Sequence, residues 1–207
     1  MFITLEGPDG SGKSMQIPAL SDYIRGMGYE VLTTREPGGT FIGDQIREVI
    51  MRLDNTSMNP RTEILLFCAA RAQIVAEVIR PQLENGVVVI SDRYADSTLA
   101  YQGYGHGVDL AVLRQLLSFA TGGLTPDLTL LFDLDVETGL SRRQAGGGEW
   151  NRLDDYELTF HRQVRAGYLE LAAAEPQRWV RIDAAQTPQQ VQLDLQKAVI
   201  ERLVPRL

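Results

Sequence analysis

The feature that most constrains this chain is a glycine-rich stretch near its N-terminus. Residues 7–14 read Gly-Pro-Asp-Gly-Ser-Gly-Lys-Ser, directly after a short apolar run at 2–5 and before a segment of helical character. Glycines at this spacing let the backbone turn tightly and direct successive N–H groups inward, where they bind phosphate together with the N-terminus of the following helix. Lys13 would then reach the β- and γ-phosphates, and the Ser14 hydroxyl would ligate Mg²⁺. The stretch predicts a strand, a phosphate-binding loop and a helix that bind a nucleoside triphosphate.

Composition narrows the class of protein further. Of the 207 residues, 44% are hydrophobic and 23% are charged, as in an ordinary globular chain, and we expect one domain over residues 1–207. The net charge of −7 argues against general nucleic-acid binding, which needs a basic face. The basic residues are eighteen arginines and only two lysines, and the planar arginine side chain suits phosphate. An acidic chain with clustered arginines indicates small anionic ligands.

The chain carries no signal of a membrane or of an oxidising compartment. Its longest apolar runs, such as residues 87–90, are far too short to span a bilayer, and the N-terminus leads into a strand instead of a signal peptide. Cys68 is the single cysteine, so no internal disulfide can form, and its apolar helical surroundings predict core packing. We expect a cytoplasmic protein that binds no membrane.

Short apolar runs alternate with helical segments along the whole chain. This alternation predicts an α/β fold, a doubly wound parallel sheet of five strands flanked by helices. The expected strands are 2–5, 30–34, 87–90, 127–134 and 179–182. Three helices are expected before the third strand: 16–28 with an irregularity at Pro18, one from Thr40 or Gly43, and a long one from Asn59-Pro60 to Asn85-Gly86 that bends at Pro81. Two shorter helices are expected after Arg93 and after Asp109. The last three are 137–143, 154–174 and one that begins at Thr187-Pro188.

Charged residues follow the predicted strands at the point where each strand ends. They are Asp9, the stretch 35–40, Asp92-Arg93-Tyr94, Asp133 and Asp183-Ala184. Because such sheets bind ligands at the carboxyl ends of their strands, this distribution indicates an active site at one edge. Asp92 would organise Mg²⁺ through a water molecule, although an aspartate in this place would also cap the following helix.

Several of these segments together resemble one protein family. They are Arg-Glu-Pro-Gly-Gly-Thr at 35–40, Phe-Cys-Ala-Ala-Arg at 67–71, Asp-Arg-Tyr at 92–94 and Tyr-Gln-Gly at 101–103. With the loop at 7–14, and in this order and spacing, they resemble thymidylate kinase along the whole chain. The resemblance implies a P-loop nucleoside monophosphate kinase-like fold. It also implies transfer of the γ-phosphoryl group of ATP to thymidine 5′-monophosphate (dTMP) with Mg²⁺, in dTTP synthesis, and a homodimer.

The resemblance also implies how the acceptor nucleotide is bound. Phe67 would stack on the thymine and Arg71, one helical turn later, would hydrogen-bond its edge; from the pattern alone, Phe67 reads as core and Arg71 as a solvated helix face. Tyr101 would crowd C2′ and disfavour a ribose, or it would be ordinary core. The implied acceptor residues are Asp9 (near the 3′-hydroxyl), Glu36, Pro37, Arg47 and Arg93 (on the phosphate), Phe67, Arg71, Ser97, Tyr101 and Gln102.

The donor side and the catalytic groups follow from the same matching. The implied ATP-binding residues are Gly7, Pro8, Asp9, Gly10, Ser11, Gly12, Lys13, Ser14, Arg142, Asp183 and Ala184. Mg²⁺ would be bound by Ser14, and through water by Asp92 and Glu36. The implied catalytic residues are Lys13, Asp9, Glu36, Arg93, Arg143 and Arg152.

The segment 142–154 corresponds to the family's lid over the phosphates. Gly10 and Ser11 stand where some members carry a loop arginine, so the chain resembles the bacterial type in which the lid supplies it. Arg143 and Arg152 are favoured over Arg142 for that role. Met15 departs from the family, because a second hydroxyl residue is usual there, and weaker ATP binding would follow.

The Glu36–Pro37 peptide bond is expected to be cis, as is common in the family's loop. A kinase of another nucleoside monophosphate, or of a deoxynucleoside, is the nearest alternative function. An ATP-dependent binding module without small-molecule catalysis is a more distant one.

Overall fold

The computed structural model describes residues 1–145 and 152–203. A parallel sheet of five strands in the order β2-β3-β1-β4-β5 forms its centre. The strands are β1 (Phe2–Glu6), β2 (Val31–Arg35), β3 (Val88–Asp92), β4 (Leu128–Asp133) and β5 (Trp179–Asp183). This confirms the predicted α/β class. The order of the strands reverses at β1, and the carboxyl end of β1 is therefore the position where such sheets bind ligands.

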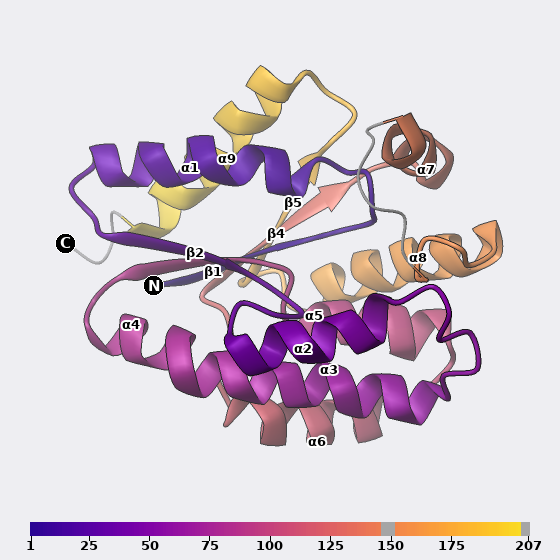
Figure 1. The fold of residues 1–207 in the computed structure, drawn as a ribbon. Helices are drawn as coiled ribbons and strands as arrows, with labels where there is room; N and C mark the ends of the chain where they lie inside the picture. The colour runs from indigo at the N-terminus through magenta and orange to yellow at the C-terminus, as the bar shows by residue number, and fades with distance from the viewer. Residues whose placement is uncertain (146–151, 204–207) are drawn as a thin grey trace.

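Helices cover both faces of the sheet (Figure 1). On one face lie α1 (Lys13–Gly26) and α9 (Pro188–Leu203); on the other lie α3 (Pro60–Ile74), α6 (Leu110–Thr121) and α8 (Leu158–Ala174). The helix α2 (Phe41–Met51) packs on α3, and α7 (Val136–Ala145) follows β4. The short helix α5 (Ala95–Thr98) follows β3.

Alternation along the central strand builds the two halves of the core. Ile3 and Leu5 point to the face of α1 and pack with Leu20, whereas Phe2 points to the opposite face. The Phe2 ring meets the Tyr94 ring edge-on, with centroids 4.8 Å apart. Both faces are apolar because a parallel strand inside such a sheet is buried on both sides.

The long helix predicted from Asn59 is interrupted near Pro81. It consists of α3, a π-helical turn η1 (Val75–Ile79) and α4 (Arg80–Glu84). Pro81 has no N–H to donate to the preceding turn, which widens to the π form there. At the start of this helix, Asn59 Oδ1 accepts the N–H of Arg61 at 2.9 Å, as its place before a proline predicted.

Two other boundaries differ from the sequence predictions. The helix α8 begins at Leu158, not at residue 154, because Arg152, Leu153 and Asp154 are buried in turn structure before it. The helix α1 begins at Lys13 and continues through Pro18 with an adjusted first turn, in which the N–H of Met15 reaches back to Gly12 at 3.2 Å. Residues 146–151 of the predicted lid lie outside the described residues.

Candidate active site

The phosphate-binding loop leaves β1 at the sheet centre and enters α1. Gly7 and Gly10 have φ angles of 136° and 74°, which side-chain-bearing residues rarely adopt. A Cβ atom at Gly10 would lie 1.9 Å from the Gly139 carbonyl oxygen of α7, so this position has no room for a side chain. Lys13 Nζ donates to the carbonyl oxygens of Gly7 at 2.9 Å and Pro8 at 2.8 Å. The ammonium group is thus held over its own loop, where a triphosphate would meet it.

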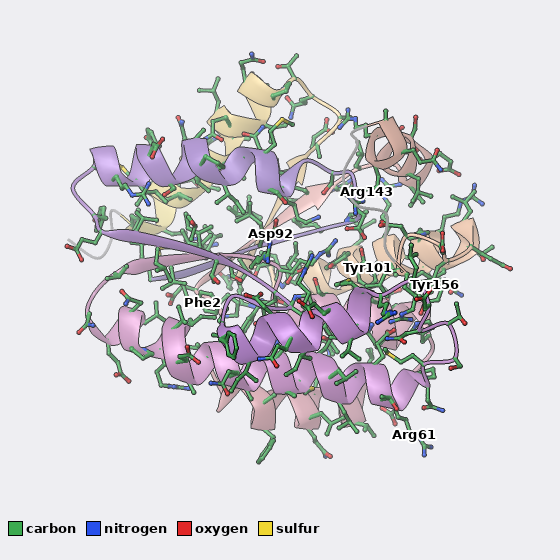
Figure 2. The ribbon with its side chains drawn as sticks, viewed as in Figure 1. Phe2, Arg61, Asp92, Tyr101, Arg143 and Tyr156 are labelled. Carbon is green, nitrogen blue, oxygen red and sulfur yellow. The ribbon has the colours of Figure 1, made fainter. Side chains whose placement is uncertain are left out.

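A cavity of about 770 Å³ opens at this loop and extends to α2, α3 and η2 (Leu99–Gly105). Figure 2 shows Asp92, Tyr101 and Arg143, from three distant segments, in the region between α1 and α2. The cavity is lined by these residues from the sequence predictions: Asp9, Gly10, Gly12, Lys13, Ser14, Glu36, Pro37, Arg47, Phe67, Asp92, Arg93, Ser97, Tyr101, Gln102, Arg142 and Arg143. Arg35 and Leu153, from the predicted stretches 35–40 and 142–154, also line it, whereas Met51, Thr98, Gln186 and Pro188 are lining residues that were not predicted.

Arg93 is the centre of the polar network in this cavity. It is the only described non-glycine residue with a positive φ, 72°, which turns its side chain back under the phosphate-binding loop. Its Nη2 donates to Asp9 Oδ1 at 2.7 Å, and its Nη1 donates to the Gly7 carbonyl oxygen at 3.1 Å. Tyr101 Oη donates to the other Asp9 oxygen at 2.7 Å. Burial alone would raise the pKa of Asp9, but Arg93 and Lys13 hold it below its usual value.

Glu6 lies directly behind this network and was not predicted. Its side chain is fully buried, and it accepts hydrogen bonds from the Tyr94 N–H at 2.8 Å, Ser97 Oγ at 2.5 Å and Tyr168 Oη at 2.9 Å. Burial, assisted by Asp96, raises the pKa of Glu6 from 4.5 to about 7. The available signal was an acidic residue ending a strand that is otherwise apolar and central.

Arg71 lies beneath the cavity and does not line it. Only 1% of it is exposed, so the reading of Arg71 as a solvated helix face is wrong. Its Nε donates to Glu36 Oε2 at 2.7 Å, its Nη1 to Thr98 Oγ1 at 3.0 Å and its Nη2 to the Tyr94 carbonyl oxygen at 3.1 Å. In this arrangement Arg71 fixes Glu36, which does line the cavity. The Glu36–Pro37 peptide is cis, which confirms that prediction.

The arginines of the predicted lid separate into two groups. Arg142 and Arg143 line the cavity; Arg142 Nη1 donates to the Ala184 carbonyl oxygen at 3.0 Å, and Arg143 Nη2 pairs with Asp154 Oδ2 at 3.1 Å. Arg152 turns away from the loop and pairs with Glu63. Its predicted approach to the phosphates is therefore absent from the conformation described for residues 152–203.

The aspartates that end β4 and β5 do not line the cavity. Asp133 pairs with Arg165 at 2.7 Å and also with Arg181. None of these three residues lines the cavity. Its position after β4 was expected to indicate the active site, and this is wrong for Asp133 because two arginines on α8 and β5 hold it. Asp183 Oδ1 accepts the N–H of Ala185 at 3.0 Å, which caps the turn before α9.

The donor atoms near the phosphate-binding loop fit a magnesium ion. Ser14 Oγ donates a hydrogen bond to Asp92 Oδ2, so a hydroxyl from the first turn of α1 and a carboxylate from the end of β3 meet beside the loop. Glu36 Oε1 is buried and accepts no hydrogen bond within residues 1–145 and 152–203. Within these ranges no group of three or more His, Cys, Asp or Glu side chains could hold a metal ion. Few protein ligands are what Mg²⁺ requires, since it keeps several of its waters.

A parallel sheet with a phosphate-binding loop at its central strand, and a cavity that extends from this loop to α2, α3 and η2, defines a P-loop nucleotide kinase. The family model for thymidylate kinase matches residues 5–195. The chain is 50% identical over 202 residues to a thymidylate kinase of Deinococcus radiodurans, covering 98% of this chain and 97% of that protein. It is 52% identical to one of Roseiflexus sp. over 198 residues, covering 90% and 88%.

A solved structure agrees with these sequence relatives. The crystal structure of thymidylate kinase from Ehrlichia chaffeensis superposes with a TM-score of 0.78 at 32% identity, covering 96% of this chain and 98% of that one. The chain belongs to the thymidylate kinase family. The resemblance drawn from the sequence motifs and the predicted P-loop kinase fold are both confirmed.

Proposed function

We propose that this protein transfers the γ-phosphoryl group of ATP to dTMP with Mg²⁺, giving the diphosphate. Membership of the thymidylate kinase family makes it a nucleotide kinase that acts on dTMP. The roles proposed for individual residues rest on one observation: a single cavity is lined by both Lys13 of the phosphate-binding loop and Phe67 of α3. A donor held by the loop and an acceptor base held against Phe67 would share this cavity and present their phosphates to one another.

On the acceptor side, an aromatic ring and arginines occupy the ends of the site. Phe67 offers an apolar face to a pyrimidine ring, and Arg47 and Arg93 offer guanidinium groups to its 5′-phosphate. Tyr101 is fixed by its hydrogen bond to Asp9 and lines the cavity, where its ring would lie beside a bound sugar. These contacts support the predicted discrimination against a ribose.

On the donor side, the loop amides, Lys13 and Arg143 would surround the phosphates. Phosphoryl transfer needs little covalent chemistry from the protein and depends on positioning and on compensating positive charge. Ser14 and Asp92 would hold Mg²⁺, whose positive charge would offset the negative charge of the phosphates. Glu36, fixed by Arg71 and with one oxygen that accepts no hydrogen bond from the described residues, would accept one from a metal-bound water or from the sugar.

A homodimer is supported by an apolar face on α2, α3 and α6. Of these helices α3 contacts both α2 and α6 (Figure 1), and Phe41, Leu65 and Phe119 are 83%, 57% and 90% exposed on them. Large exposed apolar side chains on adjoining helices mark an interaction surface.

Membrane binding is a separate question. Among the helices of residues 1–145 and 152–203, none has the length and apolar character of a membrane span. The cytoplasmic location stays a prediction.

Acceptor dependence of ATP turnover tests the proposal. We expect ADP to form rapidly from ATP with dTMP, and much more slowly with thymidine or with uridine monophosphate, because Arg47 and Arg93 need a phosphate and Tyr101 disfavours the ribose. Arg93→Ala is expected to lower kcat by about 10²-fold or more, as expected for one preorganised donor, whereas the exposed Arg61→Ala serves as a matched control and leaves it unchanged. A rate of ATP hydrolysis that is the same with and without dTMP would favour the alternative of an ATP-dependent binding module.

A further inference from the structure

A buried polar cluster lies next to the acceptor end of the cavity and has no place in the phosphoryl-transfer chemistry. Its centre is Glu63 of α3, of which 1% is exposed. Gln102 of η2 donates through Nε2 to Glu63 Oε1 at 2.7 Å, and the Arg152 guanidinium pairs with Glu63 Oε2. A charged group at this depth is costly unless its partners satisfy it, so each contact constrains the others.

Glu63 determines which way round the Gln102 amide is held. A glutamine amide has a donor end and an acceptor end of nearly the same shape, and its orientation follows from its hydrogen-bond partners. A carboxylate can only accept, so the Nε2 end of Gln102 must face Glu63. The opposite end, Oε1, accepts no hydrogen bond from the described residues, and Gln102 itself lines the cavity.

The surroundings prevent this pair from rearranging. Arg152 is anchored through Nε to the Ile50 carbonyl oxygen at 3.1 Å and through Nη1 to Tyr156 Oη at 2.9 Å, so it cannot follow a displaced Glu63. Figure 2 shows Tyr156 on the same side of the molecule as Tyr101, the neighbour of Gln102. The π-helical turn η2 brings Tyr101 and Gln102, which are consecutive, to the same cavity. The cavity that Phe67 lines therefore also receives a fixed carbonyl acceptor.

A fixed acceptor distinguishes pyrimidines by their N3 atom. Thymine and uracil carry N3–H, a donor that meets a carbonyl oxygen. Cytosine in the same pose presents the N3 lone pair, so two acceptors would face each other without a proton between them. A buried polar group left without its partner weakens binding strongly, which makes this kind of contact more selective than an apolar one.

We propose that Glu63 is a positioning residue that orients the Gln102 amide, so that the acceptor site takes pyrimidines with N3–H and rejects cytosine. This inference rests on the proposed function, because it requires a pyrimidine nucleotide at Phe67. It assigns to Glu63 and to its partner Arg152 a part in choosing the base, separate from phosphate binding.

The test compares dUMP with dCMP, which both lack the thymine methyl group and differ only around N3 and C4. In Glu63→Gln the residue at 63 can accept or donate, and the Gln102 amide is free to turn over. We expect the ratio of kcat/KM for dUMP to that for dCMP to fall by at least about tenfold. The ratio for dTMP to dUMP is expected to stay within twofold, since both bases carry the N3–H that the Gln102 carbonyl would accept.

Ratios taken on one enzyme separate base selection from general damage. A purely structural role for Glu63, or a shift of the lid through Arg152, would lower kcat/KM for all three acceptors together and leave both ratios unchanged, which would overturn the proposal. Gln102→Met keeps the Glu63–Arg152 pair and removes the amide, so it must also lower the dUMP to dCMP ratio. A Gln102→Met enzyme that retains the ratio would overturn the inference even if Glu63→Gln did not fold. If the unmodified enzyme phosphorylates none of these acceptors, the proposed function itself fails.

Discussion

Glu6 makes the stability of the fold depend on pH in an unusual direction. Its pKa is about 7 in the fold and 4.5 in an exposed carboxyl, so between these values the folded protein keeps a proton that the unfolded chain releases. The free energy of unfolding must therefore fall as the pH rises from about 4.5 to 7 and level off above that. The whole shift corresponds to about 3 kcal/mol.

Replacing Glu6 with glutamine removes this titration while keeping its shape. The glutamine oxygen can accept the Tyr94 N–H, and its amide can donate to Ser97 Oγ and Tyr168 Oη. Arg93 and Asp96 face the same carboxyl, the first lowering its pKa and the second raising it. Neither is changed by the substitution, so the difference between parent and Glu6→Gln reports the Glu6 proton together with a smaller contribution from Lys13, whose pKa the Glu6 carboxylate raises.

Urea unfolding followed by far-UV circular dichroism measures this difference. The titration is kept above about pH 6, where the net charge of −7 at pH 7 is largely retained. Between about pH 6 and 8 the parent is expected to lose roughly 1.4 kcal/mol more than Glu6→Gln, and Glu6→Gln to be the more stable protein at about pH 8. Glu84→Gln, the same change at the exposed end of α4, is the control and should follow the parent. Parallel pH curves for parent and Glu6→Gln would refute the assignment.

Three further predictions concern other parts of the molecule. Burial and the neighbouring Arg93 lower the pKa of Lys13 to about 8, so kcat/KM for ATP is expected to fall above that pH. The kcat value, which is measured with phosphates bound, is expected to fall only at a higher pH. Coincident pH profiles of kcat and kcat/KM would contradict this. Phe119→Asp on α6 is expected to shift light-scattering mass from dimer to monomer, and an unaltered mass would exclude this face. Met15 is 67% exposed and lines the cavity, so the Met15→Thr variant, which adds a hydroxyl for the phosphates, is expected to have a several-fold lower KM for ATP. An unchanged KM would mean that this position contacts no phosphate.

Features that depend on neighbours in the sequence could be predicted from it. The phosphate-binding loop, the caps at Asn59 and Asp109 and the central strands all arise from short patterns whose physics is local. Their positions in the fold follow because parallel strands bring their carboxyl ends to one edge. The same rule failed for Asp133, since it places an end of a strand but not the side chain's partner.

Features that depend on long-range partners could not be predicted. Arg71 is 35 residues from Glu36, and Arg152 is 89 residues from Glu63, so nothing in either local pattern indicates that these arginines are buried and paired. The family resemblance supplied their proximity to the site but not the groups that occupy their donors. The π-helical turns η1 and η2 were missed for a similar reason, because a single inserted residue scarcely changes helical periodicity.

The arginines around the cavity have consequences for which solutes can occupy it. Arg93 already holds Asp9 and Arg143 already holds Asp154, so the protein supplies internal counter-ions to its own cations. An arriving anion that offers charge alone must compete with carboxylates tethered beside the guanidinium groups, and inorganic phosphate or sulfate gains little from the exchange. A nucleotide brings a base, a sugar and a phosphate together, and only a ligand with such combined contacts displaces the Asp9 and Asp154 carboxylates from their arginines at cellular salt concentrations.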